Sequence, residues 1–582
     1  MDRLFTRSTT AKYTALNKIW DFLADPQNKG IDQKWYESFP ENTIEMCVPS
    51  CWNTTLGYFR YVGTAWYRTF FETSEENIHI TFEAVNNECD VYIDGKHIGH
   101  HYGGFVEFGF DAFGIGCGKH EITVRVNNTP NLKDTIPHEN CDWYNYGGIC
   151  RGVGVVEISN VLIRNTVIRY TLSEDMKKAG INIEAELFAL KETTDTIKVY
   201  CDDKLVCQKE ITVDGNGIFA LDGISLDNIR LWDIAKPNLY HITVEFGGEN
   251  LTERIGFRKI ETREKDVYLN GRKIKIIGVC RHEIHPDWGF SMPFNLIKKD
   301  IDIIKDLNCN AVRGAHYPHS KKTIDYCDQQ GLLFWEEIPL WGNLLDWNES
   351  LKEDSFVQRI LTMFGEMIKR DINHPSIVFW GLYNEIDTSL PQSRALTEKM
   401  VAMVKKTDSS RLTSFATCSV HPGNPQDICS DLVDVVGFNY YTGWFPSVTE
   451  ETFEQYIARM RSQVDANAKG RKMPMMMSEF GGAGIKGMCS FESQRWTENY
   501  QSLLLTKGIE SYFGSEEMCG GFIWQFCNAQ SQPCFELQRP GGVNNKGLVD
   551  EYRRPKAAFE TVKQLYCKLN PDSDNVTEIE LF

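Results

Sequence analysis

The chain has 582 residues, which is too long for a single hydrophobic core, so we expect a protein of several domains. A formal net charge of −18 argues against nucleic acid as a partner, because phosphate backbones bind basic surfaces. No apolar run reaches the roughly 18 residues of a membrane-spanning helix, and the polar start of the chain, Met1–Tyr13, lacks the apolar centre of an export signal. We therefore expect no membrane partner and a cytoplasmic location, in which the 18 cysteines stay reduced.

Residues 1–162 are predicted to form a β-sandwich. Residues 77–85 alternate between apolar and polar side chains, and Val91–Ile98 is typical of a hairpin that turns at Asp94-Gly95. Aromatic residues are dense in this part of the chain, and we expect most of them to fill the sandwich core rather than to stack on sugars.

Residues 163–261 form a second run of short alternating strands, with the length of an immunoglobulin-like sandwich. The expected strands include Ile181–Leu190, Thr196–Val206 and Tyr240–Phe246. No catalytic or binding motif is recognised in this stretch of the sequence, so we expect a spacer that orients the first domain against the third.

In residues 262–582 the pattern of predicted elements changes. After a predicted hairpin at Asn270-Gly271, strands alternate with helices. Eight strand-and-helix units predict a (β/α)₈ barrel, or TIM barrel, so the fold class of the whole chain is β plus α/β. The eight expected strands are Ile274–Val279, Ala311–Arg313, Leu332–Glu336, Ile377–Leu382, Leu412–Ala416, Val435–Asn439, Met475–Glu479 and Gly521–Gln525.

Two of these strands lead into a glutamate, Glu385 in one case and Glu479 in the other. In parallel barrels, active sites lie at the carboxyl ends of the strands. A single glutamate at a strand end is ordinarily solvated or salt-bridged. A pair on one barrel is typical of the two catalytic carboxylic acids that cleave a glycosidic bond. Asn384, which precedes Glu385, can donate a hydrogen bond to the 2-hydroxyl of a sugar.

Polar side chains also follow the other strands, where a barrel places its ligand contacts. Neither a metal nor an organic cofactor is expected, since Gly114–Gly118 lacks the strand and helix of a nucleotide fold and His282–His285 has the wrong spacing for a zinc helix. The polar residues at strand ends are Arg281, His282, Glu283, Arg313, His316, Glu336, Glu337, Asn439, Tyr440, Tyr441 and Trp524.

Three stretches, Gly30–Ser38, Leu231–Tyr240 and Asn310–Pro318, resemble glycoside hydrolase family 2, and the likeness runs nearly from end to end. It departs at Gly314, where a small hydroxyl-bearing residue is usual, and we expect a local change in the shape of the pocket. The resemblance implies a jelly-roll sandwich, an immunoglobulin-like sandwich and a barrel, in this order.

The resemblance also implies roles for single residues. Glu385 would be the acid/base, Glu479 the nucleophile and Tyr441 the residue that holds the nucleophile. His316, Trp524 and Arg281 are expected as walls or orienting groups.

Within this family the chain resembles the β-glucuronidases. Asn544 and Lys546 match an Asn-x-Lys motif that implies binding of the C6 carboxylate of the sugar, and an ammonium with an amide suits that group. Asp142 and Arg539 match further positions of the substrate site. Phe445 stands where some relatives have a tyrosine that contacts the aglycone.

We therefore expect a retaining, exo-acting hydrolase that releases β-D-glucuronic acid through a glycosyl-enzyme intermediate. Its partner would be a small glucuronide or an oligosaccharide that ends in a uronic acid, and the chain would form a homo-oligomer, either a dimer or a tetramer. Three alternatives stay open. They are a β-galacturonidase, which differs only at C4, a β-galactosidase of the same family, and a carbohydrate-binding protein without catalysis, against which the presence of both glutamates speaks.

Overall fold

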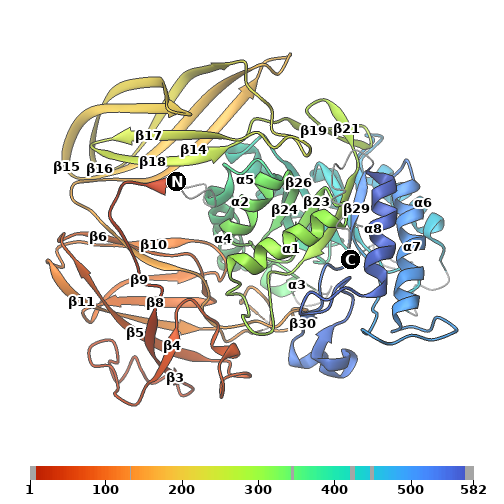
Figure 1. The fold of residues 1–582 in the computed structure, drawn as a ribbon, viewed down its shortest axis with the longest axis horizontal. Helices are drawn as coiled ribbons and strands as arrows, with labels where there is room; N and C mark the ends of the chain where they lie inside the picture. Colours follow the sequence, from red (N-terminus) through yellow and green to blue (C-terminus); the bar gives the residue numbers. More distant parts are fainter. Residues whose placement is uncertain (1–7, 132, 343–346, 420–426, 446–450, 571–582) are drawn as a thin grey trace, which may run out of the picture.

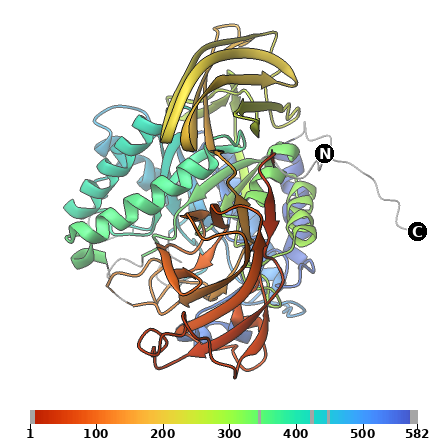
Figure 2. The same cartoon turned by 90° about the vertical axis from the view of Figure 1, so that its left-hand side faces the viewer.

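A computed structural model describes residues 8–131, 133–342, 347–419, 427–445 and 451–570. Figure 1 shows the first sandwich in red and orange, the middle sandwich in yellow, and the barrel in green to blue. Figure 2 shows the two sandwiches at opposite ends of the same side of the barrel. None of the described helices combines the length and the apolar character that crossing a bilayer requires. The predicted fold class, two sandwiches followed by a TIM barrel, is confirmed.

The first domain packs a sheet in the order β10-β6-β13-β2 against a sheet in the order β4-β3-β5-β11-β8-β9. Several of its large aromatic residues, among them Trp20, Trp52 and Tyr67, are buried in the core of the sandwich, as predicted. The predicted hairpin is also confirmed, because Ile93 pairs with Lys96 across the turn. The strands are β2 (Tyr13–Ala15), β3 (Ile19–Asp25), β4 (Ile44–Cys47), β5 (Thr64–Thr73), β6 (Ile78–Phe82), β8 (Glu88–Ile93), β9 (Lys96–Tyr102), β10 (Phe108–Ala112), β11 (Gly118–Asn127) and β13 (Val153–Glu157).

The middle domain differs from the prediction in one respect. The expected strand Thr196–Val206 is divided by a turn at Asp202-Asp203, whose φ angles of 44° and 68° are in the left-handed region that aspartate tolerates. Its first half continues the same strand that contains Ile181–Leu190. The strands are β14 (Val161–Leu172), β15 (Lys178–Cys201), β16 (Lys204–Asp227), β17 (Tyr240–Phe246) and β18 (Glu249–Ile255).

In the described part of the third domain, eight parallel strands close into a barrel. They are β22 (Ile276–Arg281), β23 (Ala311–Gly314), β24 (Leu333–Glu337), β25 (Ile377–Asn384), β26 (Leu412–Thr417), β27 (Val435–Asn439), β28 (Met475–Phe480) and β29 (Gly520–Ile523). The helices around them are α1 (Phe294–Asp306), α2 (Lys321–Gln330), α3 (Trp347–Ser350), α4 (Asp354–Asp371), α5 (Pro391–Thr407), α6 (Phe453–Asn467), α7 (Glu498–Gly514) and α8 (Ala557–Leu569).

The strand β25 illustrates why these segments form a barrel. All eight of its residues are buried, since one face meets the interior of the barrel and the other meets the surrounding helices. A continuous apolar run satisfies both faces, and the first polar groups appear only where the strand ends. The amphipathic helix α4, with Ile360, Phe364 and Ile368 on its buried face, covers the outside.

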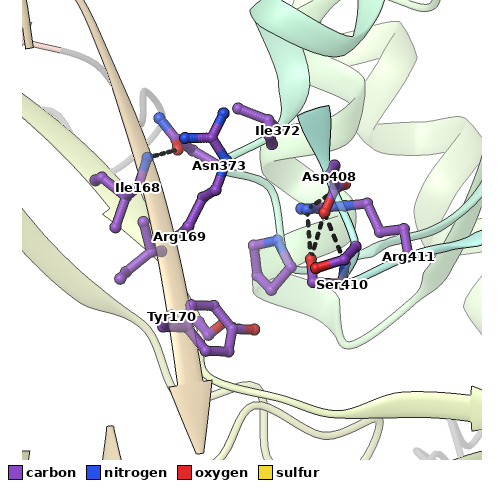
Figure 3. A pocket seen from close by; sticks show the side chains of 12 residues that line it. Ile168, Arg169, Tyr170, Ile372, Asn373, Asp408, Ser410 and Arg411 are labelled. Carbon is purple, nitrogen blue, oxygen red and sulfur yellow. Dashed lines mark hydrogen bonds and ion pairs between the residues drawn. The ribbon is translucent and has the colours of Figure 1, made fainter. Parts of the chain in front are cut away.

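The middle sandwich is fixed to the barrel by hydrogen bonds to backbone groups. Figure 3 shows Ile168 of β14 donating its backbone N–H to the side chain of Asn373, over 3.0 Å. Beside this contact lies a cavity of about 40 Å³, which has room for roughly one water molecule and not for a sugar ring. This junction therefore orients the domains and offers no substrate site.

Candidate active site

A cavity of about 260 Å³ lies at the carboxyl ends of the barrel strands. Both predicted catalytic residues, Glu385 and Glu479, line it, together with His316, Tyr441 and Trp524. The first domain also contributes, because the loop that follows β11 reaches the mouth of the barrel and places Asp142 in the wall. That loop is anchored where the backbone N–H of Tyr144 donates to the carbonyl oxygen of Gln530, over 2.8 Å.

Glu385 follows β25 directly, with a backbone φ of 55°, a value uncommon outside glycine and typical of functional sites. Its carboxylate accepts one hydrogen bond, from the side-chain amide of Asn439, over 2.9 Å. Burial, and then the negative charge of Glu479, raise the pKa of Glu385 to about 8. At neutral pH this carboxyl group therefore holds a proton.

Glu479 lies in β28 and is only 4% exposed. One carboxylate oxygen accepts a hydrogen bond from the guanidinium of Arg313 over 2.8 Å, and the other accepts from the hydroxyl of Tyr441 over 2.6 Å. Two donors, one of them cationic, stabilise the negative charge and fix the direction of the carboxylate.

Arg313, at the end of β23, connects this part of the site. It is fully buried and donates to Glu337 over 2.9 and 3.1 Å, and to the side-chain oxygen of Asn384 over 2.8 Å. The same oxygen of Asn384 accepts from Asn439 over 3.0 Å, so its amide nitrogen is the part of the side chain left to donate. A single guanidinium thus connects the neighbouring strands β23, β24 and β25 to β28 across the barrel.

His316 and Trp524 form one wall of the cavity. Their rings stack at 4.9 Å with an angle of 22°. His316 also directs Nδ1 toward Glu337 at 2.8 Å, which fixes the orientation of the imidazole ring. The wall is therefore rigid and aromatic, as a pocket for a sugar ring requires.

Lys546 supplies a cation at the other side of the cavity. Its ammonium lies 5.2, 5.9 and 5.5 Å from the ring centres of Tyr441, Trp444 and Phe445, and it makes no hydrogen bond or ion pair within the described ranges. The side chain is 7% exposed. Burial, and then the neighbouring Arg539, lower the pKa of Lys546 to about 8. Rings stabilise such a charge in part, but a carboxylate would complete its surroundings.

Asp142 lies between two partners from the loop that follows β29. It forms an ion pair with Arg539 and accepts a hydrogen bond from the amide of Asn544 over 3.0 Å. Nη1 of Arg539 is buried and has no hydrogen-bond partner in the described part of the chain, so it remains available to a ligand. Asn544 is absent from the cavity lining, and it contacts the site through Asp142.

Other polar residues at strand ends point away from the cavity. Arg281, expected as a wall, pairs instead with Asp300 of α1 at 3.0 Å. Glu283 accepts the backbone N–H of Ser320 at the start of α2, and Glu336 pairs with Arg370 at 3.0 Å. These side chains tie helices to the barrel.

Three further residues shape the site, although the sequence marks them only as polar residues at strand ends. Arg313, Glu337 and Asn439 hold Glu479, His316 and Glu385 in place. Each of the three stands at the end of an apolar run, and this position in the sequence could have indicated a buried polar group.

One group of three metal-ligand side chains occurs in the described residues, namely Asp325, Asp328 and His374. His374 lies 2.7 Å from one oxygen of Asp328, and the other oxygen accepts the backbone N–H of Ser376 over 2.9 Å. These side chains are therefore already engaged in hydrogen bonds, and the group fixes α2 to the segment before β25.

Three family profiles cover nearly the whole chain. "Glycosyl hydrolases family 2, sugar binding domain" matches residues 13–159, "Glycosyl hydrolases family 2" matches 161–258, and "Glycosyl hydrolases family 2, TIM barrel domain" matches 260–571. A beta-glucuronidase of Paenibacillus borealis is 25% identical and aligns over 97% of this chain and 99% of its own. A beta-galactosidase of Thermoanaerobacterium thermosulfurigenes is 32% identical over 97% of this chain and 77% of its own.

A solved structure, the GH2 beta-galacturonidase from Eisenbergiella tayi bound to galacturonate, superimposes with a TM-score of 0.89. It is 30% identical and covers 98% of this chain and 99% of its own.

Proposed function

The chain belongs to glycosyl hydrolase family 2 and is therefore a glycosidase, and on this premise we propose that it releases β-D-glucuronic acid from glucuronides. The reaction retains the configuration at C1, through two displacements and a covalent glycosyl-enzyme intermediate. Glu479 is the nucleophile and Glu385 the acid/base.

In the first step, a carboxylate oxygen of Glu479 bonds to C1 while the bond from C1 to the glycosidic oxygen breaks. Glu385 gives its proton to that oxygen, so the aglycone leaves as a neutral alcohol. Its pKa of about 8, raised by burial and by Glu479, keeps this proton in place at neutral pH.

In the second step, a water oxygen bonds to C1, the ester bond to Glu479 breaks, and Glu385 takes the proton of the water. Once Glu479 is an uncharged ester, its repulsion no longer raises the pKa of Glu385, so that residue becomes a suitable base. The amide nitrogen of Asn384 donates to the 2-hydroxyl in both transition states.

The ammonium of Lys546 is the main observation that supports a uronic acid as the substrate. It is nearly buried in the cavity and pairs with no carboxylate in the described part of the chain. Burying an unpaired charge costs free energy, which a substrate carboxylate at C6 would offset. Nη1 of Arg539, which has no hydrogen-bond partner among the described residues, offers a second donor nearby. A neutral hexose would leave these two donors without a carboxylate to bind.

The test is Lys546→Ala assayed on an aryl glucuronide and on the matching glucoside. We expect kcat/KM on the glucuronide to fall about 10- to 150-fold, since a hydrogen bond to a charged group contributes roughly 1.5–3 kcal/mol. Hydrolysis of the glucoside should hardly change, because it has no carboxylate to lose. Equal losses on both substrates would show that Lys546 acts through the fold, and would remove the main support for a uronidase.

A β-galacturonidase is the second candidate, and the structural similarity to a galacturonate-bound family member favours it. The same carboxylate contacts serve both acids, which differ only in the direction of the 4-hydroxyl. Kinetics on a glucuronide and a galacturonide with the same aglycone separate the two.

The proposal also includes a homo-oligomer in the cytoplasm. All 18 cysteines are free thiols, in agreement with a reducing compartment. Light scattering on the purified protein measures the oligomeric state directly, and a monomer would contradict this part.

A further inference from the structure

Two buried side chains, one on α7 and one immediately before α8, hold the loop that carries Lys546. Lys556, which is 3% exposed, donates from Nζ to three oxygens. These are the carbonyl oxygens of Gly484 and Asn545, each at 2.8 Å, and the side-chain oxygen of Asn528 at 3.2 Å. The three acceptors belong to the segment after β28, the segment after β29, and the loop of residues 544–547.

Gln501 of α7 makes the second connection. Its amide nitrogen lies 2.9 Å from the carbonyl oxygen of Gly482, and 3.2 Å from those of Lys546 and Gly547. The segment of Gly482 directly follows the strand of Glu479. Gln501 therefore ties the backbone of Lys546 to the part of the barrel that carries the predicted nucleophile.

The loop fits closely against its supports. A Cβ atom on Gly547 would lie 2.3 Å from the backbone nitrogen of Asn528, and the N–H of Gly547 donates to the side chain of Asn528 over 3.2 Å. In such a packed region a loop has no other conformation available without breaking these contacts.

Packing alone does not explain a lysine at position 556. Its Nζ forms no ion pair within the described ranges, and burial lowers the pKa of Lys556 to about 7. An unbranched apolar side chain would fill the space without burying an ionisable group. What a methionine lacks is the ability to donate to three separate backbone segments at once.

We propose that Lys556 and Gln501 are positioning residues for uronate recognition, which hold the loop of residues 544–547 so that Lys546 faces the cavity. They touch no substrate. The inference rests on the proposed function, because the selectivity at stake is that for an acidic sugar. The catalytic glutamates keep their own contacts, through Arg313, Tyr441 and Asn439, when the two ties are removed.

The test is Lys556→Met and Gln501→Met, each assayed on an aryl β-glucuronide or β-galacturonide and on the matching glucoside or galactoside. Loss of a positioned charge–carboxylate contact predicts a drop in kcat/KM on the uronide of about tenfold or more, mainly through KM. The neutral glycoside should change by less than about threefold, since its reaction does not use that contact.

Tyr566→Phe is the matched control. This residue is also buried on α8 and donates to a backbone carbonyl, that of Gly278 in β22, over 3.0 Å. Removing its hydroxyl costs a similar buried hydrogen bond far from the loop, so stability falls while the ratio of uronide to neutral activity stays unchanged. Lys556→Gln, which retains two N–H donors, should restore part of the ratio.

Two results would overturn the inference and leave the proposed function intact. The first is an equal loss of activity on both substrates in the methionine variants. The second is a ratio of uronide to neutral activity that falls as far in Tyr566→Phe as in those variants. A wild-type protein without preference for the uronide would overturn the proposed function itself, and this inference with it. Should Lys556→Met fail to fold, the ratio measured for Gln501→Met decides the matter.

Discussion

Glu385 and Glu479 have the same chemistry but different neighbours. Glu479 accepts from a guanidinium and a phenol, whereas among the described residues Glu385 accepts only from the neutral amide of Asn439. Burial therefore acts on Glu385 with little compensation, and the charge of Glu479 adds to it. This difference in surroundings supports the proposed roles of Glu385 as the acid and Glu479 as the nucleophile.

The pH dependence of kcat/KM follows from these surroundings. As pH rises through about 8, Glu385 loses the proton that it must donate, so activity on every substrate should fall along an alkaline limb. Lys546, whose pKa is also about 8, loses its charge in the same range, so activity on a uronide should fall more steeply than on a neutral glycoside. Rate profiles on both substrates from pH 5 to 10 measure this. Superimposable limbs would contradict the role of Lys546, and a flat profile would contradict that of Glu385.

Residue types at strand ends could be predicted from the sequence, but the partners of each side chain could not. Glu385 and Glu479 stand out because each follows an apolar strand. Arg313 looks no different from Arg281 in sequence, yet Arg313 donates to Glu479 and Arg281 pairs with Asp300 of α1. The direction of a side chain depends on the twist of the closed barrel, and no local pattern contains it. The hydrogen bond from Asn544 to Asp142 joins two domains, and it too could not be predicted from the sequence.

At the scale of elements, the barrel strands could be predicted closely because burial on both faces gives an uninterrupted apolar run. The observed bounds of β27 are those expected, and β25 extends two residues beyond its predicted end. The error at Thr196–Val206 has a local cause. The two aspartates of the turn interrupt the alternation only briefly, so the periodicity continues from β15 into β16. Gly314, where the family resemblance predicts a hydroxyl-bearing residue, packs against Phe334, whose ring would lie 2.6 Å from an added Cβ.

Arg313 joins four strand ends, so its loss should affect more than one of them. Arg313→Met would leave the buried carboxylates of Glu337 and Glu479 without their cation. Breaking a buried ion pair in this way costs about 3–5 kcal/mol of stability. We expect a lower unfolding temperature and a severe loss of kcat. Arg313→Lys keeps the charge but cannot bridge all acceptors. Its unfolding temperature and kcat should therefore lie between those of Arg313→Met and those of the wild type. Unchanged unfolding and turnover in Arg313→Met would contradict the assigned role.

At the scale of the whole molecule, the candidate site combines two domains. The barrel supplies both glutamates, and the first sandwich supplies Asp142 through a loop that is anchored on Gln530. The middle sandwich offers no group to the cavity and fixes the geometry through contacts such as that of Ile168 with Asn373. The order of the three parts could be predicted from hydrophobic patterns, whereas the reach of a loop from one domain into another could not.

Closure of the barrel also sets the distance between β25 and β28, and hence the stereochemistry. Retention needs the two carboxyl groups roughly 5–5.5 Å apart, against roughly 6.5–9.5 Å for inversion. We expect proton NMR of the reaction mixture to detect the β-anomer of the released sugar first, with the α-anomer appearing later by mutarotation. The α-anomer as the first product would show that water, rather than Glu479, attacks C1.

The central claim is that this glycosidase acts on an acidic sugar, and a panel of four substrates tests it most directly. The initial rates of wild-type protein would be measured on aryl β-glucuronide, β-galacturonide, β-glucoside and β-galactoside, all with the same leaving group. Because a contact with Lys546 contributes roughly 1.5–3 kcal/mol, we predict that kcat/KM on at least one uronide exceeds that on the neutral glycoside of the same ring configuration by about tenfold or more. Faster hydrolysis of the galactoside than of both uronides would contradict the account.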